Sequence, residues 1–370
     1  MVLSQLILTG VQIMTRTRAL FFSLCTLFVL SFVVPFSSAA TLPANIQSSV
    51  EQQDSRYQRM ADNFFVMYDP STAMDVPYKN TGLTRIEAQK EILEKSNATL
   101  PELGWQAGLY PHWKGGLWLH GSPMAFKPYY PTHRYDNQAF DAAIQELPVR
   151  PQSPPMLQTG LMKLEHLLGL PGLTEVFIFS DGQDSTFEPL EPMPLEQAKK
   201  LDKMFNICFT IISSATEPEG QQLLNQIGSI NSCSQVIDFD TVYDNPEHLF
   251  GKLYMDADNT FKNILFDFDK SNVKPKYHKE LNTLGQFLTD HPAAYVVLSG
   301  FTDSIGTEIY NIGLSKRRAQ SVQRYLQQRF NLSKNRILLY WYGYANPVAS
   351  NATREGRQLN RRVTITLRKK

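Results

Sequence analysis

Cysteine is scarce in this sequence, with 3 Cys among 370 residues. A scaffold held together mainly by disulfides needs a higher density, so that class is excluded. The 20 Gly and 22 Pro residues are too few for a collagen-like chain, and the 42% hydrophobic content excludes a largely disordered one. Only one uncharged run approaches the length of a membrane-spanning helix, which excludes a polytopic membrane protein.

Motifs of common enzyme classes are also missing. The chain contains no G-x-S-x-G, no H-E-x-x-H, no phosphate-binding P-loop and no paired Cys/His spacing. His112, His120 and His133 belong to no regular motif. The sequence therefore nominates no catalytic residue and predicts a protein that is not an enzyme.

Charge is divided unevenly along the chain. Residues 41–259 contain 15 Lys and Arg against 28 Asp and Glu, whereas residues 260–370 contain 19 against 7. A chain of 370 residues is also longer than one hydrophobic core usually fills. We therefore predict two different modules, one over 61–255 and one over 260–370, with a linker over 41–60.

Residues 1–40 have the features of a secretory signal peptide. Two arginines precede the uncharged run from Ala19 to Phe36, and small residues follow it up to Ala40. We predict cleavage after Ala40 and a true start at Met14, because the residues before Met14 form an atypical uncharged leader. The alternative is a retained membrane anchor, since this run is nearly long enough to span a bilayer.

Export allows disulfide formation. Cys208 and Cys233 are the two cysteines outside the leader, and each adjoins an apolar run. If those runs are neighbouring strands, the two residues can pair. Two buried free thiols are the alternative.

The segment 61–255 alternates apolar runs with helical patterns, which predicts a parallel sheet with helices on both faces. Oxygen-bearing side chains stand at three points of this pattern. Asp69 and Ser71 follow one expected strand, Asp181 follows another, and Thr159 lies at the start of an expected helix. This arrangement resembles the Rossmann-like von Willebrand factor A domain. The resemblance implies that these four residues hold Mg²⁺ or Mn²⁺ and that the module binds a protein partner.

One position departs from that family's D-x-S-x-S loop, because the residue expected to be the second Ser is Ala73. Loss of this hydroxyl removes one metal ligand. The alternative is a degenerate site in which the same side chains serve only as helix caps and turn residues.

The segment 260–370 predicts the order β-α-β-α-β-β, a small α/β sandwich, with a break near Gly313 in its long helical region. Arg318 lies on the same helical line as Leu314, Val322 and Leu326. A guanidinium on an apolar face needs a carboxylate, because a buried unpaired charge costs several kcal/mol. Asp303 is the nearest candidate, either in an internal salt bridge or as part of a ligand site.

The run from Gly300 to Gly306 (GFTDSIG), the run LSKRRA at 314–319 and the closing G-R-x-x-N-R-R-V at 356–363 resemble the OmpA-like domain. That resemblance implies non-covalent binding of peptidoglycan through the zwitterionic end of diaminopimelate. Asp303 would take the ammonium and Arg318 the carboxylate. The remaining contacts would come from Asn311 and Thr302, with Asn360 and Arg361 as structural support.

Together these features predict a periplasmic tether associated with the cell wall and held near the outer membrane by partners. One module would bind peptidoglycan and the other an unidentified envelope protein. The alternatives are a membrane-anchored tether and an enzyme acting on peptidoglycan. An ion-driven stator subunit is disfavoured because 19–36 has no ionisable residue. Nucleic acid is disfavoured by export.

Overall fold

The computed structural model describes residues 57–113, 127–183, 192–256, 260–292 and 294–369. The leader expected over 1–40 lies outside these residues, as does most of the linker expected over 41–60. Residues 57–59 of that expected linker form strand β1 (Tyr57–Arg59), which pairs antiparallel with β8 (Tyr254–Asp256). The linker boundary predicted at residue 60 is therefore wrong. Within the described residues, no helix is long and apolar enough to cross a membrane.

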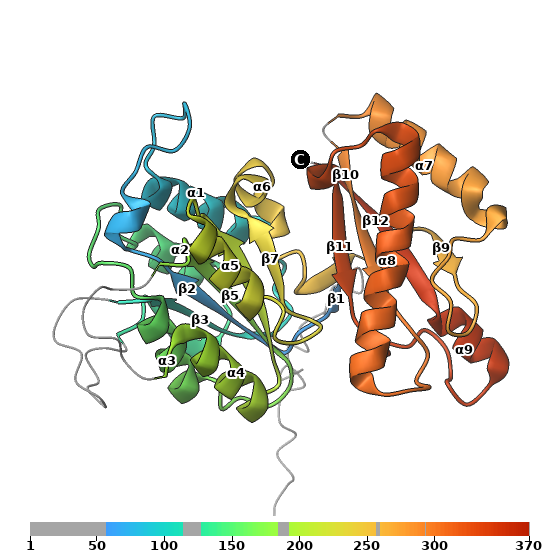
Figure 1. Cartoon of the computed structure of the whole chain (residues 1–370), viewed down its shortest axis with the longest axis horizontal. Helices are drawn as coiled ribbons and strands as arrows, with labels where there is room; N and C mark the ends of the chain where they lie inside the picture. The colour runs from blue at the N-terminus through green and yellow to red at the C-terminus, as the bar shows by residue number, and fades with distance from the viewer. Residues whose placement is uncertain (1–56, 114–126, 184–191, 257–259, 293, 370) are drawn as a thin grey trace, which may run out of the picture. The chain divides into compact units, whose positions relative to one another are not determined.

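A six-stranded sheet forms the centre of the first module (Figure 1). Its strands, in spatial order, are β4 (Tyr130–Arg134), β3 (Gln106–Pro111), β2 (Asn63–Tyr68), β5 (Thr174–Ser180), β6 (Ile207–Ser213) and β7 (Gln235–Asp238). All neighbouring pairs are parallel except β3 with the edge strand β4. The chain thus builds the parallel sheet that its long apolar runs predict.

Helices cover both faces of this sheet, as a strand buried on each side requires. Alternate residues of β2 belong to different cores, with Phe64 and Val66 on one face and Phe65 and Met67 on the other. The first core also takes side chains from α1 (Arg85–Asn97), α2 (Asn137–Gln145) and α6 (Phe239–Asp244). The second takes them from α3 (Leu157–Leu167), α4 (Pro194–Met204) and α5 (Pro218–Ile227). Short 3-10 turns are η1 (Thr72–Met74) and η3 (Pro246–His248).

The second module is a four-stranded sheet with its main core on one face (Figure 1). Its spatial order is β11 (Ile337–Trp341), β10 (Ala294–Gly300), β12 (Arg362–Lys369) and β9 (Thr260–Leu265). The helices are α7 (His278–Asp290), α8 (Glu308–Phe330) and α9 (Arg354–Asn360), with 3-10 turns η4 (Pro275–Tyr277) and η5 (Lys334–Arg336). Side chains of α7 and α8 pack on this core. The predicted β-α-β-α-β-β order is present, and α9 is an addition to it.

The predicted break near Gly313 in this module is wrong. Helix α8 runs unbroken through Gly313, because the buried residues beyond it, from Leu314 to Leu326, hold the helix against the sheet. That packing outweighs the cost of about 1 kcal/mol for a glycine within a helix. Strand β9 ends at Leu265, where its pairing with β12 stops, and Asp269 turns with φ of 55°.

Candidate functional site

Helix α8 lies very close to the end of β10, and this contact positions Arg318. A Cβ atom at Gly300 would stand 2.2 Å from the carbonyl oxygen of Ser315, so only glycine permits the approach. Arg318 follows one turn later on the buried face of the helix. The chain after Gly300 then turns through Phe301 and Thr302 to Asp303 beside it.

The Arg318 guanidinium is fully buried and is held by backbone carbonyl oxygens. Its Nε donates to Lys270 O at 2.9 Å, its Nη1 to Phe301 O at 2.9 Å and its Nη2 to Asp267 O at 3.2 Å. Burial lowers the pKa of Arg318 to about 10, opposed by the nearby Asp303 carboxylate. A guanidinium has five N–H groups, so these bonds leave two without a partner among the described residues.

Asp303 pairs with Arg361 and not with Arg318. Its Oδ2 accepts from Arg361 Nη1 at 2.7 Å, and its Oδ1 accepts from the backbone N–H of Ile305 at 3.2 Å. The two charged side chains are 4% and 9% exposed, so this is a buried ion pair. The internal Asp303–Arg318 salt bridge considered from the sequence is therefore wrong. Backbone carbonyls accept three of the five N–H groups of Arg318 instead.

Arg361 also fixes the surroundings of Asp303. Its Nε donates to Phe266 O at 3.1 Å and its Nη2 to Gln358 Oε1 at 2.6 Å. The sequence suggested only general structural support here, because Arg361 stands 58 positions from Asp303. The Asp303–Arg361 pair could have been found only by recognising that Arg361 is also buried and therefore needs a carboxylate partner.

The remaining expected contacts make internal hydrogen bonds in the same loop. Asn311 Nδ2 donates to Ile305 O at 3.1 Å, and Thr302 Oγ1 donates to Asp303 O at 2.9 Å. Asn360 Oδ1 accepts hydrogen bonds from the backbone N–H groups of Val348 and Ala349, so Asn360 holds the backbone at these positions. The structure thus brings Thr302, Asp303 and Asn311 together with Arg318.

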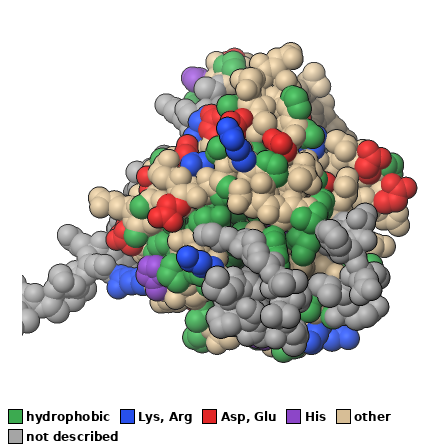
Figure 2. Space-filling view, turned by 90° about the vertical axis from the view of Figure 1, so that its left-hand side faces the viewer, with side chains coloured by type: hydrophobic (Ala, Val, Ile, Leu, Met, Phe, Trp, Pro, Cys, Tyr) green, Lys and Arg blue, Asp and Glu red, His purple; other side chains and the backbone are tan. Residues whose placement is uncertain are grey.

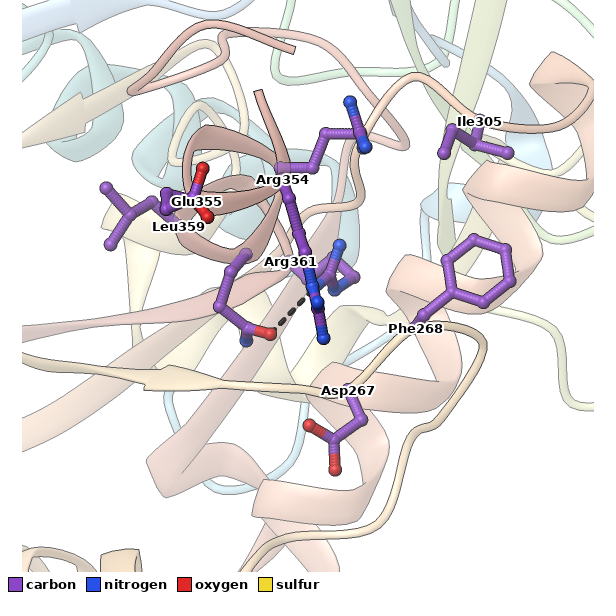
Figure 3. Close-up of a pocket in the computed structure, with 9 residues that line it drawn as sticks. Asp267, Phe268, Ile305, Arg354, Glu355, Leu359 and Arg361 are labelled. Atoms are coloured by element: carbon purple, nitrogen blue, oxygen red, sulfur yellow. Dashed lines mark hydrogen bonds between the residues drawn. The ribbon is translucent and has the colours of Figure 1, made fainter. Parts of the chain in front are cut away.

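A groove of about 910 Å³ adjoins this loop (Figure 3). It runs between the loops that hold Phe268 and Ile305 and helix α9, and its lining residues are Asp267, Phe268, Ile305, Arg354, Glu355, Arg357, Gln358, Leu359 and Arg361. Phe268, Ile305 and Leu359 are each about half exposed. Sequence reasoning missed this groove because its walls come from three separate segments.

In the first module, Asp69 and Ser71 follow the end of β2, Asp181 follows the end of β5, and Thr159 lies in the first turn of α3. Asp69, Ser71, Thr159 and Asp181 are all buried. Ser71 N donates to Asp69 Oδ1 at 3.1 Å, and Gln183 N donates to Asp181 Oδ1 at 3.0 Å. Burial, with the Asp181 carboxylate as a second cause, raises the pKa of Asp69 to about 7.

Two basic side chains that the sequence did not suggest lie at this position. His112 Nδ1 is 4.0 Å from Asp69 Oδ1, and burial lowers the pKa of His112 to about 3. Lys163 Nζ donates to Pro111 O at 2.7 Å and His112 O at 2.9 Å, and burial lowers the pKa of Lys163 to about 7. Neither residue is part of the pattern that suggested the metal ligands.

We expect the residues present here to bind Mg²⁺ or Mn²⁺ weakly or not at all. Mg²⁺ requires near-octahedral oxygen coordination, and Ala73 supplies no side-chain oxygen at the third loop position. Across the described ranges, no group of three or more His, Cys, Asp or Glu residues is placed to hold a metal ion. The buried amine of Lys163 near His112 further disfavours a second cation.

Cys208 on β6 and Cys233 just before β7 form a disulfide, with Cα atoms 5.4 Å apart. These two strands are parallel neighbours. The disulfide therefore joins β6 to the segment that leads into the edge strand.

Comparison with known proteins concerns the second module. The OmpA family matches residues 265–361. Residues 265–361 form an OmpA-like domain. This match does not reach residues 61–255, so the von Willebrand factor A resemblance stays a prediction.

Several proteins resemble the OmpA-like domain in sequence. Outer membrane porin F of Pseudomonas aeruginosa is 42% identical over 100 residues, 27% of this chain and 29% of that protein. Outer membrane protein A of Bordetella avium is 43% identical over 122 residues, 33% of this chain and 60% of that protein. The peptidoglycan-associated lipoprotein of Buchnera aphidicola is 39% identical over 102 residues, 28% of this chain and 58% of that protein. The matches span less than two thirds of each relative.

Among solved structures, the crystal structure of the peptidoglycan-associated lipoprotein from Burkholderia pseudomallei is similar to this chain. It is 29% identical, and the match covers 29% of this chain and 91% of that one with a TM-score of 0.28.

Proposed function

We propose that this chain is a non-catalytic cell-envelope protein that binds peptidoglycan non-covalently through its OmpA-like domain. The observation that supports this best is the placement of opposite charges in one buried site. Arg318 and Asp303 are both almost fully buried, and Asp303 is close enough to oppose the lowering of the Arg318 pKa. The end of diaminopimelate carries an ammonium and a carboxylate on one carbon, which is the complementary pattern.

The two charges have distinct roles in this proposal. The ligand carboxylate binds the two free N–H groups of Arg318, since a guanidinium suits bidentate binding of a carboxylate. The ligand ammonium binds the Asp303 carboxylate. Arg361 already donates to Oδ2 of this carboxylate, so it holds Asp303 in place and shares it with the ammonium.

Localisation follows from the same proposal. The relatives named above are outer-membrane and peptidoglycan-associated proteins by name. We infer that this chain lies in the periplasm against the cell wall, near the outer membrane. N-terminal sequencing of the exported protein tests whether the leader over 1–40 is cleaved. Cleavage after Ala40 is expected, and an intact leader means a membrane-anchored tether instead.

We further propose that residues 61–255 bind another envelope protein. The excess of acidic residues in this module favours a basic partner surface. On the face drawn in Figure 2, however, acidic side chains lie at several separate places among apolar and basic ones and form no one patch. Crosslinking in whole cells through residues of this module, with the chain lacking 61–255 as the control, tests the interaction.

A sedimentation assay with purified peptidoglycan sacculi tests the main proposal. The wild-type chain should sediment with sacculi, and Arg318→Ala should stay in the supernatant because the carboxylate loses its partner. Arg324→Ala on the exposed face of the same helix is the matched control and should sediment normally. Equal sedimentation of all three chains would contradict the proposal. Release of soluble fragments from the sacculi would instead favour an enzyme.

A further inference from the structure

The groove beside Asp303 contains three arginines, of which two already have partners. Arg361 binds Asp303 and Gln358, and Arg357 Nη1 donates to the carbonyl oxygens of Asn351 and Ala352 at 2.8 and 3.0 Å. Arg354 makes no hydrogen bond or ion pair with any residue that the structure describes. It is exposed at the groove wall, so its guanidinium is available to a ligand.

The position of Arg354 gives no gain in helix stability. It is the first residue of α9, where the helix dipole disfavours a positive charge. The other charges of the groove do not neutralise it. Asp267 is paired with Lys274, and Figure 3 shows the Glu355 carboxylate directed away from the Arg354 guanidinium.

Two residues that line the groove contact Asp303 of the proposed zwitterion site. Ile305, one of its apolar residues, donates its backbone N–H to Asp303, and Arg361 bridges from the groove to the same carboxylate. Phe268 and Leu359 add half-exposed apolar surface along the groove. A ligand bound at Asp303 and Arg318 can therefore extend past these side chains to Arg354.

We propose that Arg354 binds a second carboxylate of the same peptidoglycan stem peptide, outside the zwitterion, while Phe268, Ile305 and Leu359 contact its methylene groups. This inference rests on the proposed function. In a stem peptide the residue before diaminopimelate is a glutamate linked through its γ-carboxyl, which leaves its α-carboxylate free. That group is the expected ligand of Arg354. The groove thus selects stem peptides whose glutamate is not amidated.

Calorimetry with a matched pair of ligands tests this selectivity. The full chain is titrated with the tripeptide L-Ala-γ-D-Glu-diaminopimelate and with the same peptide whose glutamate α-carboxylate is amidated. The wild type should bind the amidated peptide roughly fivefold more weakly, as expected for one exposed charge pair. Arg354→Gln should bind both peptides with the weaker affinity.

Two controls separate this inference from the proposed function. Arg324→Gln removes an exposed positive charge outside the groove and should keep the fivefold preference. Arg318→Ala should bind neither peptide. If the wild type binds the tripeptide but Arg354→Gln keeps the preference, or if the wild type has none, the inference is wrong and the proposed function stands. If the wild type binds neither peptide, both are wrong.

Discussion

Replacing Asp303 by Asn separates the structural from the binding role of this carboxylate. The substitution keeps the size of the side chain but removes its charge. Arg361, 9% exposed, would then hold a buried positive charge without a carboxylate partner. Removing one partner of a buried ion pair costs about 3–5 kcal/mol. We expect the lower end, about 3 kcal/mol, because Arg361 keeps its hydrogen bonds to Phe266 O and Gln358 Oε1.

Hydrogen exchange of the full chain measures this loss in the right module. Backbone amides of β10 and α8 report the stability of the OmpA-like domain. A loss of about 3 kcal/mol corresponds to roughly a hundredfold faster exchange where global unfolding limits it. Diaminopimelate binding should also disappear, since the ammonium loses its partner.

A double variant distinguishes the two effects. Asp303→Leu combined with Arg361→Met replaces the pair by apolar side chains, which is often neutral for stability. This chain should recover most of the lost protection but still fail to bind the ligand. Unchanged exchange in Asp303→Asn would refute the reasoning, because it would mean that the ion pair contributes nothing to the fold.

Three other predictions concern the first module. Calorimetry with Mg²⁺ or Mn²⁺ should show weak or no binding, because Ala73 removes a ligand and Lys163 lies nearby; micromolar binding would restore the metal site. Mass mapping under non-reducing conditions should find Cys208 joined to Cys233, and reduction should lower stability by roughly 3 kcal/mol for a separation of 25 residues; two free thiols in exported protein would contradict the pairing. Burial raises the pKa of Asp69 from 3.8 to about 7, so the folded state binds this proton more tightly than the unfolded state does. Stability should therefore fall, by up to about 4 kcal/mol, as pH rises from about 4 to 7. Asp69→Asn should remove that fall in urea unfolding at pH 4.5 and 7.5, and parallel curves for the two chains would disprove it.

The order of helices and strands could be predicted because apolar periodicity records which faces are buried. The run at 63–68 is apolar at nearly every position, and β2 is buried on both faces. The helical line through Arg318 also predicted its burial. Boundaries were harder, since the end of β9 depends on where β12 stops pairing with it, which is a contact between distant segments.

Partners within the site could not be predicted from local pattern. Asp303 and Arg318 are close in sequence, which suggested a salt bridge between them. In the structure, Asp303 forms an ion pair with Arg361, and Arg318 donates hydrogen bonds to three backbone carbonyl oxygens. Every residue has a backbone carbonyl, so the sequence does not show which carbonyls accept hydrogen bonds from a buried arginine. The groove around Arg354 was missed for a related reason, since its walls come from separate loops and α9.

A crystal structure of the chain with diaminopimelate tests the central claim most directly. The account predicts that the ligand carboxylate lies within hydrogen-bonding distance of the Arg318 guanidinium and that its ammonium contacts Asp303. A site that stays empty at saturating ligand, or a ligand bound elsewhere on the chain, would contradict it.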